Sequence, residues 1–429
     1  MKAVYAWYRR LMRHRLLAFL TASALTASIF GVGRAVQGAA PDWPQLLGPE
    51  RNGVYTGPPL AETWPKDGPP KVWQISVGEG FAGPVVVGER VILFHRRSYE
   101  EIVEAFDSRT GKSVWRFAYK TNYRDDFGFD EGPRSVPVVA NGRVYTFGAE
   151  GMLHAIDLMT GKSIWNVDTM RRFGVPKGFF GAAGSPLVED GRVIANIGGK
   201  GAGIVAFNAD TGEVLWTATD HQASYSSPVG ATFGGRRQVI FFTRNGLISL
   251  DPSTGAVIFQ RPWRSRSASS VNAATPLVIG DLLFASATYE TGATVMRVNG
   301  NQLTELWSSD DVMSNHYATS VYHDGYLYGY HGRQEFNPSF RAVDVKTGAV
   351  KWSVDRYRAG SVTLVGDRLL IARETGELVL APASPEAFKP LAQARVLRGT
   401  VRALPAVSDG FVYLRNENTL VCLDLRRPQ

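Results

Sequence analysis

The stretch AFDSRTGKSVW at residues 105–115 is repeated four times along the chain with little change. Each copy has Thr-Gly at its centre, Asp or Asn in third place and Trp or Phe in last place. The alternating apolar residues on either side of Thr-Gly predict a strand, a tight turn and a second strand. The further copies are AIDLMTGKSIW (155–165), AFNADTGEVLW (206–216), SLDPSTGAVIF (249–259) and AVDVKTGAVKW (342–352).

A second pattern, an apolar hairpin around a short turn, precedes each place where this phrase occurs or is expected. One hairpin and one phrase make four strands in 40–50 residues, a period typical of propellers. We therefore predict an all-β fold, an eight-bladed β-propeller of four-stranded antiparallel blades. The eight hairpins span 83–94, 136–147, 185–196, 227–242, 275–286, 319–330, 360–371 and 404–415.

Each conserved place in the phrase has an expected physical role. Asp107 and its equivalents Asp157, Asp251 and Asp344 are expected to accept backbone hydrogen bonds in the turn. The Gly after Thr supplies a positive φ, and the small first residue allows neighbouring sheets to approach closely. The aromatic ring is expected to dock on the next blade rather than to bind a ligand. These docking residues are Trp73, Trp115, Trp165, Trp216, Phe259, Trp307 and Trp352.

The two ends of the repeat region are incomplete in complementary ways. Residues 420–429 stop before a fourth strand, whereas residues 70–77 carry Trp73 without a preceding third strand. We therefore expect 71–77 to pair beside 419–425, which closes the ring over residues 71–429 and leaves no free sheet edge. Residues 41–70 are a lead-in segment. The phrase is degenerate around Trp307 and after residues 377–380.

The first 40 residues have the pattern of an export signal. Arginines at positions 9, 10, 13 and 15 precede the uncharged stretch 16–33, and small residues follow at 38–40. We expect residues 1–40 to be a signal peptide, with a retained membrane anchor through 16–33 as the alternative. Either reading places the body outside the cytoplasm, periplasmic or secreted.

The net charge bears on whether the chain binds nucleic acid, and the cysteine content bears on whether disulfides stabilise it. The formal net charge of +8 falls to +2 without residues 1–40, so charge gives no support for nucleic-acid binding. Cys422 is the single cysteine of the chain, which excludes an internal disulfide. The body therefore depends on packing and strand pairing for its closure.

The repeated phrase resembles the tryptophan-docking repeat of pyrroloquinoline-quinone (PQQ) dehydrogenases and of the non-enzymatic outer-membrane assembly propeller lipoprotein. The opening DWPQLLGPERNGVYTG (42–57) is similar to the start of exported PQQ-binding-like β-propeller repeat proteins. The resemblance covers residues 42–425 and implies the propeller fold. It implies PQQ and Ca²⁺ as cofactors if the chain is a dehydrogenase of alcohols or sugars.

The chain departs from both relatives at their functional features. With one cysteine it lacks the adjacent pair that many quinone dehydrogenases place against the quinone, and their Ca²⁺-binding motifs are not found in the sequence. The lipid-bearing cysteine of the assembly lipoprotein is also absent from the start of the chain. We therefore assign no catalytic residue and no metal ligand, and we name no cofactor.

Candidate binding residues lie on the loops that vary between copies. In each unit, the turns between the first and second strands and between the third and fourth strands are short and uniform. The other connections differ in length and share the opposite face of the ring. Binding groups usually occupy such variable loops, and we place the site around the mouth of the central channel. The candidates are Arg134, Lys200, Tyr225, Asn272, His316, His331, Arg333 and Glu335.

Each candidate also has an ordinary structural interpretation. Arg134 is expected to pair with Glu131 or Asp130. The acidic residues Asp125, Asp126, Asp130 and Glu131 are expected to form a solvated loop, with a Ca²⁺ site as the alternative. His316, His331 and Glu335 are expected to make loop hydrogen bonds, with a metal site or an acid–base pair as the alternative.

Two functions follow from these patterns. The favoured one is a non-catalytic, exported propeller that binds a protein, peptide or glycan through the variable loops. The alternative is a small PQQ-dependent dehydrogenase with its site at the channel mouth.

Overall fold

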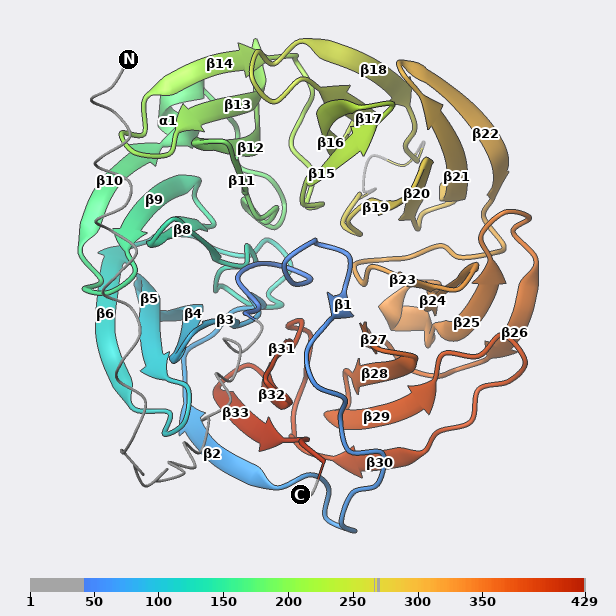
Figure 1. The fold of residues 1–429 in the computed structure, drawn as a ribbon. Coiled ribbons are helices and arrows are strands. Elements are labelled where there is room, and N and C mark those ends of the chain that lie inside the picture. The colour runs from blue at the N-terminus through green and yellow to red at the C-terminus, as the bar shows by residue number, and fades with distance from the viewer. Residues whose placement is uncertain (1–41, 266, 268–270, 428–429) are drawn as a thin grey trace, which may run out of the picture. The chain divides into compact units, whose positions relative to one another are not determined.

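The structure is a computed structural model that describes residues 42–265, 267 and 271–427. The predicted export signal, including 16–33, lies outside these residues. The described residues form one compact unit, a ring of eight antiparallel sheets around a central axis (Figure 1). This confirms the predicted eight-bladed β-propeller. Among the described residues, no helix has the length and apolar character needed to cross a membrane.

Each blade runs from an inner strand beside the axis to an outer strand at the rim, as predicted from hairpin and phrase. The first four blades are β3 (Val85–Val87), β4 (Arg90–Arg97), β5 (Glu100–Asp107) and β6 (Ser113–Lys120); β7 (Val138–Ala140), β8 (Arg143–Phe147), β9 (Met152–Asp157) and β10 (Ser163–Asp168); β11 (Leu187–Glu189), β12 (Arg192–Gly199), β13 (Ala202–Asn208) and β14 (Val214–Ala218); and β15 (Val229–Phe233), β16 (Arg236–Thr243), β17 (Gly246–Leu250) and β18 (Val257–Pro262).

The second half of the ring repeats this plan, and its last blade takes its outer strand from the start of the chain. The blades are β19 (Leu277–Ile279), β20 (Leu282–Ala287), β21 (Gly292–Asn299) and β22 (Gln302–Ser309); β23 (Val321–His323), β24 (Tyr326–His331), β25 (Ser339–Asp344) and β26 (Val350–Val354); β27 (Gly360–Val365), β28 (Arg368–Arg373), β29 (Glu377–Pro382) and β30 (Ala392–Arg395); and β31 (Ala406–Ser408), β32 (Phe411–Arg415), β33 (Thr419–Asp424) and β2 (Lys71–Ser76).

The ring closes through the predicted pairing of its two ends. Strand β2 runs antiparallel to β33, with Trp73 opposite Cys422 and Ser76 opposite Thr419. The blade thus joins residues from both ends of the repeat region. No blade edge is left between the first and last repeats, because this sheet is complete.

The tryptophans at the ends of the repeated phrase lie against the turn of the next blade. The indole of Trp73 covers Gly111 of the next blade and donates from Nε1 to the Ser108 carbonyl at 2.9 Å. Trp115 covers Gly161 in the same way and donates to the Leu158 carbonyl at 2.9 Å. The same arrangement recurs at Trp165, Trp216 and Trp307.

The repeated turns are held by their Asp residues, as predicted, and in the copy at 206–216 by Asn208. Asp107 Oδ1 accepts hydrogen bonds from the backbone N–H and the hydroxyl of Thr110, both at 2.8 Å. The bond from the Thr110 hydroxyl is the main cause that holds the pKa of Asp107 below its usual value. Gly111 takes the expected positive φ of 69°.

The degenerate copies change the docking contact. Phe259 stands where the other blades have Trp, and it belongs to one buried cluster with Leu283, Met296 and Val298 of the next blade. That blade has a short turn between β21 and β22 instead of the Thr-Gly turn, so it offers no equivalent docking surface. Trp352 donates to the Ser384 carbonyl at 2.8 Å and contacts Phe388, both in the loop after β29.

The lead-in segment enters the centre of the ring, which the sequence did not predict. Strand β1 (Val54–Tyr55) pairs parallel to the inner strand β27 and makes that sheet five-stranded. In Figure 1 the segment around β1 crosses the middle of the ring. It starts where the N–H of Gly88, in the β3–β4 turn, donates to Asp42, and it leaves where Ala61 donates to the Leu425 carbonyl. The lead-in therefore fills the channel from the face that carries the short turns.

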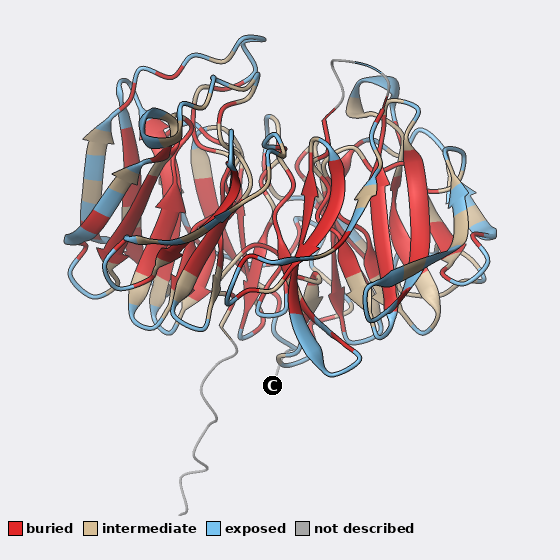
Figure 2. Ribbon diagram, turned by 90° about the horizontal axis from the view of Figure 1, so that it is seen from above, coloured by how far each residue is buried: buried red, intermediate tan, exposed pale blue. Residues whose placement is uncertain are grey.

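The ring has two unlike faces at the ends of its buried strands (Figure 2). The short-turn face holds the turns between first and second strands and between third and fourth strands. The opposite face, here called the variable face, holds the longer connections, including α1 (Thr169–Phe173) and the 3-10 helix η1 (Gln334–Phe336).

Candidate functional site

A pocket of about 210 Å³ opens on the variable face at the axis of the ring. Its deeper residues each stand two positions before an inner strand; five come from consecutive blades and Leu404 from the last blade. Leu46 of the lead-in also lines it, so the plugged channel ends beneath the pocket. The deeper lining residues are Val136, Ser185, Ser227, Thr275, Thr319 and Leu404.

Aromatic side chains form most of the upper wall. Five of them come from connections between blades, and Tyr289 comes from the connection between β20 and β21 of one blade. Aromatic walls with few polar groups are typical of binding pockets. These residues are Phe81, Phe129, Phe180, Tyr225, Tyr289 and Tyr317.

Four phenylalanines extend the wall into solvent, and we call them the phenylalanine rim: Phe127, Phe129, Phe179 and Phe180. Phe127 contacts each of the other three, with ring centroids 5.3–6.2 Å apart. Phe127, Phe129 and Phe179 are 58%, 48% and 40% exposed. Phe180 in turn contacts Tyr225 inside the pocket at 5.3 Å.

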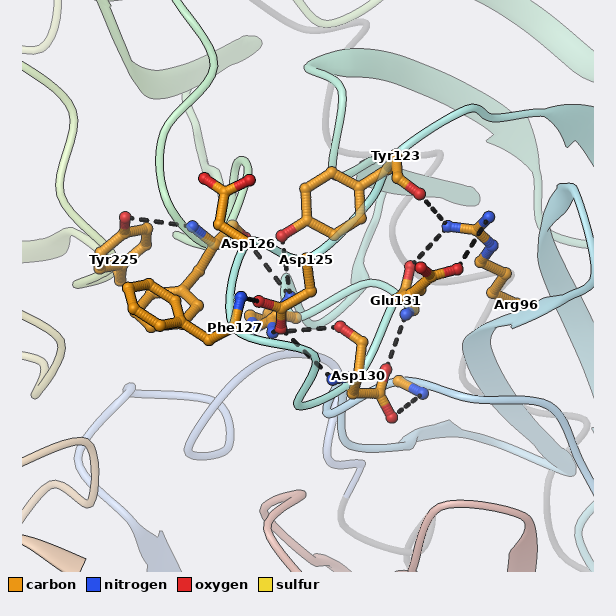
Figure 3. Close-up of polar contacts among 12 residues, drawn as sticks. Arg96, Tyr123, Asp125, Asp126, Phe127, Asp130, Glu131 and Tyr225 are labelled. Carbon is orange, nitrogen blue, oxygen red and sulfur yellow. Dashed lines mark hydrogen bonds and ion pairs between the residues drawn. The ribbon is translucent and has the colours of Figure 1, made fainter.

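The acidic loop beside the rim is only partly solvated: the prediction of a solvated loop is wrong for Asp125 and Asp130, whereas Asp126 is exposed. The Asp125 side chain is fully buried and accepts from the Phe127 N–H at 2.8 Å. Asp130 accepts from the N–H groups of Gly132 and Gly80, at 2.6 and 3.1 Å, and burial raises its pKa. Figure 3 shows the Asp125 and Asp130 carboxylates turned toward backbone nitrogens, and Glu131 beside Arg96.

Arg134 forms an ion pair with a different carboxylate from those predicted. Its Nη2 lies 2.6 Å from Asp125 Oδ2. Its hydrogen bond to Asp130 goes to the backbone carbonyl, at 3.2 Å, and not to the carboxylate. The guanidinium also lies over the rings of Phe81 and Phe180, 5.3 Å from each centroid. Asp125 replaces the expected partners because its connection folds back over the arginine.

Arg402 is the second arginine of the pocket wall. Its Nε lies 2.5 Å from Glu374 Oε1, and its guanidinium lies over Phe81 and Phe129. Both arginines that line the pocket are therefore neutralised by carboxylates. They stiffen the aromatic wall through cation–π contacts.

His316 and Glu335 line the opposite side of the pocket. His316 Nε2 lies 3.4 Å from the Tyr289 hydroxyl, and burial lowers the pKa of His316 to about 4. Glu335 pairs with Arg333 at 3.2 Å, and the Arg333 guanidinium lies 4.4 Å from the Tyr289 ring centroid. His316 is thus neutral at neutral pH.

The remaining candidates lie outside the pocket lining. Lys200 is exposed at the turn between β12 and β13. Asn272 is buried, donates to the Thr243 carbonyl at 2.8 Å and accepts from the backbone N–H of Tyr225. His331 accepts from the Ser314 N–H at 3.1 Å, and burial lowers its pKa to about 4.

The structure does not assemble His316, His331 and Glu335 into a metal site. Within residues 42–265, 267 and 271–427, no group of three or more His, Cys, Asp or Glu side chains is placed to hold a metal ion. His331 is occupied by the backbone of the β22–β23 connection instead. The carboxylates of the acidic loop likewise pair with arginines, with Lys177 and with backbone N–H groups.

Sequence reasoning missed Phe81, Tyr289, Arg402 and the rim. The stretches that hold Phe129 and Phe180 were recognised as variable connections, but charged residues were preferred over aromatic ones there. Arg402 precedes an inner strand, as Arg134 does, so its position was an available signal. Nothing in the sequence indicated that Leu46 lines the pocket, because no pattern in the lead-in places it inside the channel.

Comparison with known proteins decides the family. The family model described as outer membrane protein assembly factor BamB matches residues 99–354, more than half of the chain. The chain belongs to this family. The match begins just before β5 and ends with β26. It therefore covers the outer two strands of the first blade, the next five blades in full and the phenylalanine rim.

Relatives of the chain include outer membrane assembly factors and quinone-dependent alcohol dehydrogenases. The outer membrane protein assembly factor BamB of Burkholderia pseudomallei (strain K96243) is 30% identical over 211 residues, 48% of this chain and 49% of that protein. The quinohemoprotein alcohol dehydrogenase of Comamonas testosteroni is 34% identical over 142 residues, 32% of this chain and 19% of that protein. This BamB-family chain spans about half the length of the first relative and about a fifth of the second.

Solved structures share the fold. BamB from Moraxella catarrhalis superposes with a TM-score of 0.62 at 15% identity, over 84% of this chain and 98% of that one. The quinohemoprotein alcohol dehydrogenase of Comamonas testosteroni gives 0.63 at 16% identity, over 91% and 81%. At these identities the likeness concerns the propeller and not the site.

Proposed function

We propose that this BamB-family chain is an exported, non-catalytic propeller that holds a protein partner on its variable face. The observation that carries the proposal is the phenylalanine rim, an exposed aromatic cluster that borders the pocket. Aromatic rings left in water cost free energy that a partner recovers on binding, and such clusters mark interaction surfaces. The family description, an outer membrane protein assembly factor, supports a protein as the partner.

The charges of the pocket support binding rather than acid–base catalysis. Arg134 pairs with Asp125, and Arg402 pairs with Glu374. His316 has a pKa of about 4, whereas a general base works best with a pKa near the working pH. The groups best placed to move protons are thus paired or poorly tuned for that role.

The alternative is the PQQ-dependent dehydrogenase, favoured by the match to the Comamonas testosteroni enzyme. The residues of this pocket do not fit the cofactor. PQQ carries three carboxylates, and both arginines that line the pocket already pair with acidic side chains. Cys422 is buried in β33 and is not among the residues that line the pocket.

Co-purification from the organism that encodes the chain tests the proposal. The double variant Phe127→Ser, Phe179→Ser should recover at least tenfold less of the partner that accompanies the unaltered protein. Met159→Ser is the matched control, because Met159 is 63% exposed on the short-turn face. Equal recovery of the partner with all three proteins would refute the assignment of the variable face.

A further inference from the structure

Four hydroxyl groups form the floor of the pocket, one from each of four consecutive blades: Ser185, Ser227, Thr275 and Thr319. Ser227 Oγ accepts from the Ser185 N–H, and Thr319 Oγ1 accepts from the Thr275 N–H, both at 2.9 Å. Ser185 Oγ accepts from the Val136 N–H at 2.8 Å. In the described part of the chain, none of the four donates its own O–H to a protein acceptor, so these hydrogens are available to a ligand.

A buried cation lies beneath this floor. Arg51 of the lead-in is 2% exposed and donates from Nη1 to the Pro228 carbonyl at 2.9 Å and from Nη2 to the Pro186 carbonyl. It also reaches the carbonyl of Ser185, whose side chain lines the pocket. Burial lowers the pKa of Arg51 to about 9, so the guanidinium stays charged at neutral pH.

Arg51 differs from the arginines of the wall because its hydrogen-bond acceptors are all neutral. They are three backbone carbonyls and the Gln45 side chain. Within the described residues it has no ion-pair partner, whereas Arg134, Arg402 and Arg333 each have one. The charge at the base of the pocket is therefore positive and uncompensated, and a buried charge without a partner favours an anion nearby.

We propose that the pocket binds an organic monocarboxylate with an apolar body, its carboxylate on the hydroxyl floor above Arg51 and its body against the aromatic wall. The inference deepens the proposed function, on which it rests, by naming what the partner presents. A carboxylate accepts up to four hydrogen bonds, which matches the converging hydroxyl donors. A cation would meet the charge of Arg51, and a neutral group would leave that charge unanswered.

Two sources supply this chemistry: the C-terminus of a polypeptide and a free organic acid. The probes are 3-phenylpropionate, its amide, and a pentapeptide that ends in phenylalanine with a free or an amidated C-terminus. The free-acid peptide ends in the same phenylpropionate unit. Isothermal titration calorimetry of the full chain should show both acids binding and both amides at least tenfold weaker.

The two acids then identify the source. A peptide that binds at least tenfold more tightly than phenylpropionate indicates a polypeptide end, and equal affinities indicate a free acid. Amides that bind as well as the acids, or acids that fail to bind at millimolar concentration, would overturn the inference. PQQ that binds more tightly than phenylpropionate would also overturn it and would favour the dehydrogenase.

Thr275 gives a matched pair of variants. Its Oγ1 makes no hydrogen bond within the described residues, so Thr275→Val removes one donor to the ligand and spares the frame. Acid affinity should fall about tenfold, since a hydrogen bond to a charged group is worth that factor or more. Thr275→Ser keeps the hydroxyl and should bind within about threefold of the unaltered chain. Unchanged acid binding by Thr275→Val would refute the hydroxyl floor.

Failure of this inference can be told apart from failure of the proposed function. If the acids do not bind while the rim variant still loses the partner, the monocarboxylate is wrong and the binding face stands. If the rim variant keeps the partner, the binding face itself is wrong.

Discussion

The indole of Trp115 lies so close to Gly161 that a Cβ at residue 161 would stand 2.6 Å from the ring. Gly161 also has a φ of 71°. The glycine therefore serves both the turn of its own blade and the docking of the blade before it. Because this contact recurs around the ring, the repeat specifies blade-to-blade assembly as well as strand structure.

Gly161→Ala should lower the free energy of unfolding by about 3 kcal/mol, since it adds a steric clash with Trp115 to the cost of a positive φ. Gly142→Ala is the control. Gly142 has nearly the same φ, 72°, but a Cβ there meets nothing within 4 Å. It should cost about 1–2 kcal/mol. Equal urea midpoints for the two variants would contradict the docking role.

Arg51→Met should destabilise the ring by about 2–4 kcal/mol, because it leaves buried backbone carbonyls of Ser185, Pro186 and Pro228 without their donor. Arg51→Lys keeps the charge but not the planar fork of donors, and it should recover only part of the loss. Chemical unfolding measures both. A Met variant as stable as the unaltered chain would show that the lead-in does not brace the channel.

Acid should destabilise the fold through buried histidines. His154 is 3% exposed, lies 4.3 Å from the Tyr119 ring centroid, and has a pKa lowered to about 4 by burial. The unfolded chain, with a pKa near 6.5, binds the proton first, so stability is full above about pH 6.5 and falls toward pH 4.

The histidine effect is worth about 2 kcal/mol at pH 5. The variant His154→Leu should therefore lose about 2 kcal/mol less than the unaltered chain between pH 7 and pH 5, by urea unfolding at each pH. His316 and His331 titrate in both proteins and cancel from the comparison. Identical pH dependence in the two proteins would show that His154 is not protonated on unfolding.

Adding PQQ and Ca²⁺ to the purified chain should produce no dye-linked oxidation of alcohols or sugars. The reason is that the pocket arginines Arg134 and Arg402 already pair with carboxylates. A quinohemoprotein alcohol dehydrogenase tested in the same way is the positive control. Turnover by this chain above that of a heat-denatured sample would favour the alternative function.

The fold was predictable because its signals are local and repeated. Thr-Gly turns, alternating strands and a docking ring each occupy fixed places, so residues 71–77 and 419–425 were paired from their missing halves alone. The lead-in was not predictable. It has no period, and Arg51 binds carbonyls far away in the sequence.

The site was predicted by position better than by residue. The mouth of the channel follows from connection length, and Arg134, Tyr225, His316 and Glu335 do line the pocket. Which carboxylate pairs with Arg134 depends on how one connection folds back. The phenylalanine rim was overlooked because exposed aromatic residues in a loop have no sequence pattern that separates them from core residues.

Site-specific photo-crosslinking in cells tests the central claim, that the variable face holds a protein partner. A photoreactive residue at Phe179 should give a discrete crosslinked product, and the same residue at Met159 on the short-turn face should give none. The product should disappear when Phe127→Ser is added. A product of equal yield from Met159, or none from Phe179, would contradict the account.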